Sequence, residues 1–291
     1  MIVQQYVHEP LELTDAQIWD METITYFVPV DFSGCSYNAL HYATMLARSA
    51  PGRIHLCHVV DLDEIPDSEN PVVVSFAMDR LIKNAEEKMK SLREIISMTG
   101  ILVKEQIVMG NVKTQLRKQI EQVQPNVIVM GRNVEKTVGV GSLLRYLTRN
   151  TNVPVLVVPQ SHNPKMPNRT VLASDMDTSR EMDLAPFFDI IRQVSNELSI
   201  LNIRSGFFAN AGDAMKWLNR LNATYGMNAK LLQHQHNSSG VKGIVDFIRT
   251  HKIDLLCTVK SGNSIYDRLF DRSLATQLTS KVEVPVLVIR R

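Results

Sequence analysis

The sequence predicts an α/β protein whose 291 residues form two tandem domains, each built on a parallel sheet. Short apolar runs alternate with stretches of helical period, and strands alternating with helices of this length form parallel sheets with right-handed crossovers. The alternation stops at a polar segment, 160–168, which contains Pro164 and Pro167, and then restarts. Residues 141–158 also align without a gap with residues 272–289, and both segments contain Val-Pro-Val-Leu-Val. A tandem duplication accounts for these observations.

The composition favours a globular protein of the cytoplasm. Hydrophobic residues make up 44% of the chain and charged residues 21%, and the formal net charge of +2 gives no sign of a nucleic-acid partner. Cys35, Cys57 and Cys257 form no Cys-x-x-Cys motif, which indicates reduced thiols. No apolar run approaches the ~20 residues that span a membrane. The first Lys or Arg is Arg48, so the N-terminus lacks the positive region of a signal peptide.

The first domain is expected at 23–159, after an acidic extension. Residues 1–22 carry carboxylates and no Lys or Arg, and Thr14 with Gln17 could cap a short helix. An extra strand, an arm on a partner and a partly ordered extension are the other interpretations of this segment, and the last is the simplest. From Thr23 onward, strands are expected at 26–31, 54–60, 101–108, 127–131 and 153–158, with helices at 36–50, 74–99, 112–123 and from Gly141.

The second domain is expected at 169–291, with 160–168 as the linker between the two. Its first strand, 170–175, ends in Asp175, which takes the place of Asp31 in the first domain. The remaining pattern predicts helices at 184–198, 212–225 and 241–251, and strands at 200–203, 229–234 and 253–259, followed by the repeated final segment.

A candidate binding site lies where the strand 127–131 ends. Gly131 allows a sharp turn off the sheet, and Gly141-Ser142 opens the next helix. The backbone N–H groups in the first turn of a helix attract anions. The sequence therefore predicts a place where a phosphate could lie against backbone amides.

These features together resemble the universal stress protein family in its tandem two-domain form. The supporting motifs are Val-Pro-Val-Asp-Phe-Ser at 28–33, His-Val-Val-Asp at 58–61, Val-Met-Gly at 129–131, and Gly-Ser through Pro-Val-Leu-Val at 141–157. The resemblance covers 23–291 and implies a Rossmann-like, doubly wound fold in each domain, similar to adenine nucleotide alpha hydrolases. Each domain would be an open sheet of five parallel strands with helices on both faces and a nucleotide at the carboxyl ends.

The resemblance also implies which residues would bind ATP or another adenine nucleotide in the first domain. The adenine would lie among Pro29, Asp31 and Val59, the ribose beside Met130 and Gly131, and the phosphates at Gly141 and Ser142. Members of the family that bind ATP carry Gly-x2-Gly-x9-Gly-Ser/Thr at this place, since glycines let the backbone approach the phosphates.

Both domains depart from that pattern. In the first, nine residues (132–140) separate Gly131 from Gly141, three fewer than the motif, and Val134 replaces the middle glycine. Three residues correspond to up to ~10 Å of extended chain, and Gly139 is the residue that could restore some backbone freedom. In the second domain the spacing from Val259 through Gly262 to Arg272-Ser273 is intact, but two of three glycines are lost. If either domain binds a nucleotide, we therefore expect it to be the first. We expect the nucleotide motif of the second domain to be degenerate.

Other groups of acidic, histidine and basic residues have explanations that require no catalytic or metal site. Asp31 and Asp175 could cap the following helices, and Asp175 with Asp177 falls short of a metal site. The His55/His58 and His234/His236 pairs lack further ligands. Basic residues near the two loops could hold phosphates or lie on a solvated face: Arg132, Lys136, Arg145 and Arg149, then Lys260, Arg268 and Arg272. Ser33-Gly34-Cys35-Ser36 is similar to the phosphate loop of ATP-pyrophosphatases but lacks its second glycine, and we interpret it as a helix start.

Three functions remain open. The first is a non-catalytic stress-response protein that binds an adenine nucleotide. The second is an interaction scaffold that binds none, and the third is a weak ATP-hydrolysing enzyme, for which neither a catalytic residue nor a metal site is found. The two Val-Pro-Val-Leu-Val strands would lie at sheet edges, which need cover. They could pair with each other within one chain or support a homodimer.

Overall fold

The computed structural model describes residues 23–132, 140–174, 185–195, 197–202, 211–232, 241–260 and 282–290. The first half contains β1 (Ile24–Pro29), α2 (Gly34–Ser49), β2 (Gly52–Val60), the 3-10 helix η1 (Leu62–Glu64), α3 (Pro71–Ser97), β3 (Leu102–Met109), α4 (Val112–Val123), β4 (Val127–Arg132), α5 (Val140–Asn150) and β5 (Val155–Pro159). The second half contains β6 (Arg169–Ser174), α6 (Ala185–Val194), β7 (Glu197–Asn202), α7 (Ala211–Tyr225), β8 (Lys230–Leu232), α8 (Val241–Thr250), β9 (Leu255–Lys260) and β10 (Val286–Arg290).

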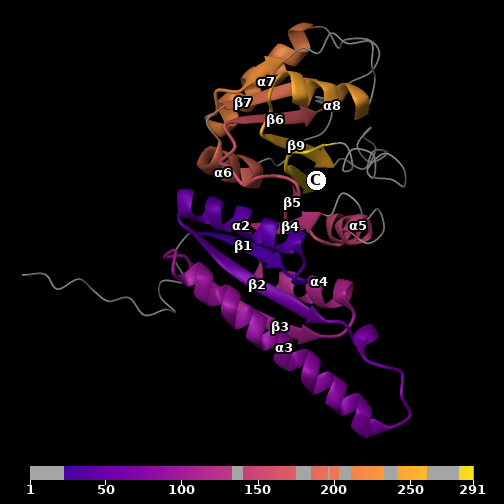
Figure 1. The fold of residues 1–291 in the computed structure, drawn as a ribbon. Coiled ribbons are helices and arrows are strands. Elements are labelled where there is room, and N and C mark those ends of the chain that lie inside the picture. Colours follow the sequence, from indigo (N-terminus) through magenta and orange to yellow (C-terminus); the bar gives the residue numbers. More distant parts are fainter. Residues whose placement is uncertain are drawn as a thin grey trace, which may run out of the picture.

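All these strands form one sheet of ten strands in the order β3-β2-β1-β4-β5-β10-β9-β6-β7-β8 (Figure 1). The two halves have the same topology, because β8-β7-β6-β9-β10 repeats the spatial order β3-β2-β1-β4-β5. Neighbouring strands within each half are parallel. The two halves meet at β5 and β10, which pair antiparallel, with Leu156 opposite Leu287. This pairing places the two Val-Pro-Val-Leu-Val segments side by side, so neither forms an open edge.

The sheet carries one apolar layer on each face. Alternate residues of the central strands point to opposite sides: Tyr26 and Val28 to one layer, Phe27 to the other. Helices α2, α3 and α6 contribute to the first layer, and α4, α5 and α8 to the second. The predicted open α/β sheet with helices on both faces is therefore confirmed.

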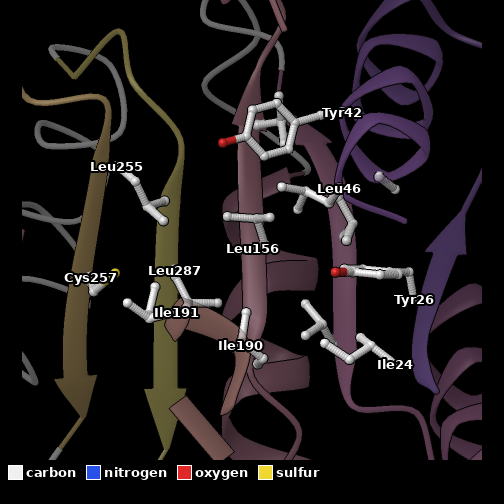
Figure 2. Packing of buried hydrophobic residues seen from close by; sticks show 14 of the residues in the cluster. Ile24, Tyr26, Tyr42, Leu46, Leu156, Ile190, Ile191, Leu255, Cys257 and Leu287 are labelled. Carbon is white, nitrogen blue, oxygen red and sulfur yellow. The ribbon is translucent and has the colours of Figure 1, made fainter. Parts of the chain in front are cut away.

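Both apolar layers continue across the β5–β10 seam. In Figure 2, Leu156 of β5 lies between residues of the first half and residues of the second. The labelled side chains on the two sides are Ile24, Tyr26, Tyr42, Leu46 and Ile190, Ile191, Leu255, Cys257, Leu287. The two halves therefore share a core as well as a sheet.

The structure differs from the expected elements mainly at helix ends. The helix predicted at 184–198 ends at Val194, because Ser195 leaves it and its hydroxyl bonds to the backbone carbonyls of Asn168 and Glu197. Helix α3 begins at Pro71, earlier than the predicted 74, since the Asn70 side chain accepts a hydrogen bond from the Val72 N–H and caps it.

The segment 160–168 is held by both halves. The Asn38 amide of α2 donates to the carbonyls of Pro159 and His162, at 2.9 and 2.8 Å. On the other side, the Asp254 carboxylate accepts from the Asn168 and Arg169 N–H groups at 3.1 and 3.0 Å and pairs with Lys165. In the described ranges, no helix combines the length and apolar character needed to cross a membrane.

Candidate functional site

The candidate site lies at the carboxyl ends of β1 and β4, which are neighbours in the sheet. After β1 the chain enters α2, whose buried face contributes to one apolar layer, whereas α5, the helix after β4, contributes to the other. The chain therefore leaves β1 toward one face of the sheet and β4 toward the other. In open α/β sheets this topological switch point is where ligands bind.

Asp31 lies two residues after Pro29, the last residue of β1, and is exposed. Its carboxylate accepts hydrogen bonds from the N–H and the hydroxyl of Ser33, and Ser33 in turn caps α2 by accepting from the Ser36 N–H at 3.3 Å. Burial tends to raise the pKa of Asp31, but hydrogen bonds from Ser33 and Ser36 outweigh it and hold the pKa below its ordinary value. Asp31 is therefore an anion at neutral pH that orders the start of α2.

Phe32 occupies the turn between Asp31 and Ser33 with a φ of 60°, in the left-handed region that a bulky residue rarely adopts. Its ring lies 4.3 Å from the ring of His58, and Lys88 Nζ lies 5.0 Å from its centroid. His58 Nδ1 donates to the Val30 carbonyl at 2.8 Å. These contacts fix the turn beside the site, and the sequence carried no signal for them, because backbone conformation at a phenylalanine cannot be read from residue types.

Gly131 packs directly against the backbone of the first turn of α2. A Cβ at this position would lie 2.0 Å from the Cys35 carbonyl oxygen and 2.8 Å from the Ser36 nitrogen. Since real Cβ contacts are not this short, only glycine allows the end of β4 to approach the helix so closely. Gly131 therefore sets the spacing between β4 and α2 at the switch point, whether or not a ligand is bound.

Gly141 and Ser142 lie in the first turn of α5, which begins one residue earlier than predicted, at Val140. Ser142 is exposed. The backbone of this turn supplies the N–H groups that the sequence predicted for a phosphate. Its helix is anchored by Leu144 and Leu147, which are 4% and 0% exposed.

The other predicted residues lie close to the same edge of the sheet but differ in how far their side chains are exposed to solvent. Pro29 ends β1 opposite Cys57 of β2, and Val59 lies one residue before the end of β2; both are partly exposed. The Met130 side chain is 3% exposed and packs in the apolar layer with Leu144. Only the backbone of Met130 could therefore border a ligand.

Arg132 does not lie where the sequence suggested. Its side chain is 5% exposed, and Nη2 donates to the Val282 carbonyl of the second half at 2.8 Å. Burial lowers its pKa to about 10, and Nε and Nη1 make no hydrogen bond to any residue in the described ranges. Arg149 lies in the last turn of α5, away from Gly141. Arg132 therefore fits neither of the two interpretations offered for it, whereas Arg149 fits the solvated face at a helix C-terminus.

The two central histidines lie on opposite faces of β2, as expected from their spacing. His55 stacks on Phe27 at 5.6 Å and approaches Gln106 Oε1 at 3.4 Å, while His58 contacts Phe32 on the other side. Burial lowers the pKa of His55, which is therefore neutral at pH 7. Within the described ranges, no three His, Cys, Asp or Glu side chains gather as a metal site.

Several residues singled out from the sequence lie outside the described residues, as does the extension 1–22. They are Val134, Lys136 and Gly139 of the first loop, Asp175, Asp177, His234 and His236, and Gly262, Arg268, Arg272 and Ser273 of the second loop.

Comparisons with known proteins agree with this architecture. Residues 26–159 match the model of the Universal stress protein family. The chain is 26% identical over 152 residues to "Universal stress protein MJ0577" of Methanocaldococcus jannaschii, a match that covers 46% of this chain and 94% of that protein.

Two solved structures match over almost the full length. A universal stress protein from Archaeoglobus fulgidus has a TM-score of 0.68 at 17% identity, covering 92% of this chain and 96% of that one. The functionally unknown protein PA1789 from Pseudomonas aeruginosa has a TM-score of 0.52 at 11% identity, covering 92% and 93%. Both halves therefore share the fold of the Archaeoglobus fulgidus protein, and residues 26–159 carry the similarity to the universal stress protein family model.

Proposed function

We propose that the first half binds one adenine nucleotide at the switch point and that the protein is a non-catalytic stress-response protein of the cytoplasm. The adenine would lie among Pro29, Asp31 and Val59, and the ribose beside the backbone of Met130 and Gly131. The phosphates would lie at the first turn of α5, at Gly141 and Ser142.

One observation carries this proposal: Gly131 is the penultimate residue of β4, and Gly141-Ser142 lies in the first turn of α5, the helix that follows β4 at the switch point. Gly141 has no side chain to cover the backbone at the start of α5, whereas Gly131 lets the end of β4 lie close to the start of α2. The helix start is also where backbone N–H groups and the helix dipole favour an anion.

Asp31 suits the adenine end of the site. Its lowered pKa keeps the carboxylate ionised, and an ionised carboxylate can accept about four hydrogen bonds. Ser33 supplies two of them, from its N–H and its hydroxyl. The remaining acceptor capacity could take an N–H of the exocyclic amine of adenine.

The second half, 169–291, would serve as a structural partner of the domain at 23–159. Its own loop has lost two of three glycines and carries Arg272 where the first half has Gly141. Both edges of β5 and of β10 are already paired within the chain. A homodimer would therefore need a surface other than the final strands.

The test compares two chemically identical substitutions, Gly141→Asp and Gly212→Asp. Both glycines are the second residue of a helix, α5 and α7 respectively. An aspartate in the first turn favours the helix, so both variants should fold. At Gly141, however, the new carboxylate would repel the phosphates.

We expect ATP, ADP or AMP to raise the thermal stability of the unmodified chain and of Gly212→Asp, but not of Gly141→Asp. Ligand at a hundred times its dissociation constant adds ~2.7 kcal/mol to the free energy of unfolding. Equal stabilisation of all three proteins would place the nucleotide elsewhere. No stabilisation of the unmodified chain at millimolar nucleotide would refute the proposal.

The alternative function, a scaffold without nucleotide, is favoured by the short first loop, nine residues between Gly131 and Gly141. It predicts no response to any of the three nucleotides. A weak ATPase predicts magnesium-dependent release of phosphate, which we do not expect.

A further inference from the structure

A second concave surface lies between α2 and α3. The groove has a volume of about 1190 Å³. Leu40 and Met45 of α2 and Leu92 and Ile95 of α3 make it apolar. Ile95 is 62% exposed, so the apolar lining of the groove includes a large side chain that faces solvent. Exposed apolar patches of this kind mark interaction surfaces.

Basic side chains border the apolar line. His41 and Arg48 come from α2 and Lys88 from α3, and all three are exposed. Among the described residues that line the groove, Glu87 is the one carboxylate. The groove consequently fits a segment that combines apolar and acidic residues.

One end of the groove lies where the described part of the chain begins. Arg48, Ser49 and Thr99 line that end, at the C-terminal ends of α2 and α3. Two residues beyond Ser49, the Pro51 carbonyl accepts a hydrogen bond from the Ile24 N–H at 3.2 Å. The residues before Thr23 therefore start beside the groove.

Those residues have the required chemistry. Residues 1–22 contain Glu9, Glu12, Asp15, Asp20 and Glu22 but no Lys or Arg, together with apolar residues such as Ile18, Trp19 and Met21. The groove runs along α2 from Tyr37 to Arg48, roughly 17 Å at 1.5 Å per residue. A segment of 22 residues is long enough to follow it in any regular conformation.

We propose that residues 1–22 dock along the α2–α3 groove of the same chain, with their apolar residues on Leu92 and Ile95 and their carboxylates near Arg48 and Lys88. Docking within one chain is favoured over docking between chains, because the tether at Thr23 holds the segment at a high effective concentration.

Tryptophan fluorescence tests the proposal, since the chain contains only Trp19 and Trp217. In a Trp217→Phe background, Trp19 is the sole probe of the segment. Acrylamide quenching of Trp19 is measured before and after two further substitutions on α3. Ile95→Glu lies in the groove; Phe76→Glu, at a side chain 75% exposed outside it, is the matched control.

We expect Trp19 to be protected from quenching in the background chain and in Phe76→Glu. Ile95→Glu should shift the docking equilibrium by roughly tenfold or more toward the quenched form, because it removes one large aliphatic contact. Quenching equal to that of the urea-unfolded chain in the background protein would overturn the proposal. So would protection that grows with protein concentration, which would place the segment in the groove of a second copy.

A measurement without substitutions guards against variants that fail to fold. Carbodiimide joins a carboxylate to a neighbouring lysine amine, so treatment of the unmodified monomer should link 1–22 to Lys88. Links to Lys88 only in dimeric products, or no such link in the monomer, would contradict docking within one chain.

Discussion

Gly131→Ala is the substitution whose effect follows most directly from the structure. The new Cβ would lie 2.0 Å from the Cys35 carbonyl oxygen and 2.3 Å from its carbonyl carbon. Both atoms belong to the backbone of α2 and cannot move by a side-chain rotation. The start of α2 must therefore move by about 1 Å or more from the end of β4.

The cost of this displacement should lie at the upper end of the range for overpacked sites, about 3 kcal/mol. The start of α2 is fixed by the Ser33 cap and by the hydrogen bonds from Asn38 to the carbonyls of Pro159 and His162, and both would be strained. With a urea dependence of ~1–3 kcal/mol per molar, the unfolding midpoint should fall by about 1 M or more.

Gly212→Ala is the control, because no atom of the described residues lies within 4 Å of the Cβ that it would introduce in α7. We expect this variant to be at least as stable as the unmodified chain, since alanine favours a helix more than glycine does. If urea unfolding showed Gly131→Ala to be as stable as the unmodified chain, the close approach of β4 to α2 would be wrong.

Three further predictions concern buried or bridging polar groups and are all read by urea unfolding. Arg132→Met should leave the free energy of unfolding within about 1 kcal/mol or raise it, because two guanidinium nitrogens are buried without a hydrogen bond to the described part of the chain; a loss above 2 kcal/mol would contradict this. Asp254→Asn should cost about 1–3 kcal/mol at pH 7, since Lys165 and two backbone N–H groups lose a charged partner. Burial tends to raise the pKa of Asp254, but Lys165 and the two N–H groups hold it below 3.8 in the folded protein. The carboxylate therefore stabilises the fold fully above pH 3.8, and this stabilisation is lost as the pH falls through the lowered pKa. A stability difference between the unmodified chain and Asp254→Asn that persists below that pH would contradict this. Burial lowers the pKa of His55 and His162 below 6.5, so just under that pH the unfolded chain binds more protons than the folded one. The free energy of unfolding should therefore fall as the pH drops below 6.5, and less steeply in His55→Gln. A free energy of unfolding that does not change over this pH range would contradict the prediction.

Much of the fold was predictable because its determinants are local. Apolar runs such as 54–60 and amphipathic stretches such as 112–123 carry their period in the sequence, and the structure places β2 and α4 there. The repeated Val-Pro-Val-Leu-Val segments indicated two similar edges, and β5 and β10 cover each other. Patterns that depend on burial of whole strands and helices therefore survive in the sequence.

The site was less predictable because its geometry depends on contacts between distant segments. The spacing predicted Gly131, Gly141 and Ser142 at one edge, but not that Cys35 would lie against Gly131. A basic residue after a glycine suggested a phosphate ligand at Arg132, yet its side chain reaches Val282, 150 residues away. Residue types alone do not say toward which neighbour a long side chain turns.

The central claim is that this chain holds one nucleotide site, in its first half. Calorimetric titration of the intact chain with ATP tests it most directly. We predict saturable binding at one nucleotide per chain, lost in Gly141→Asp and kept in Gly212→Asp. Absence of binding at millimolar ATP, or two equivalent sites per chain, would contradict it.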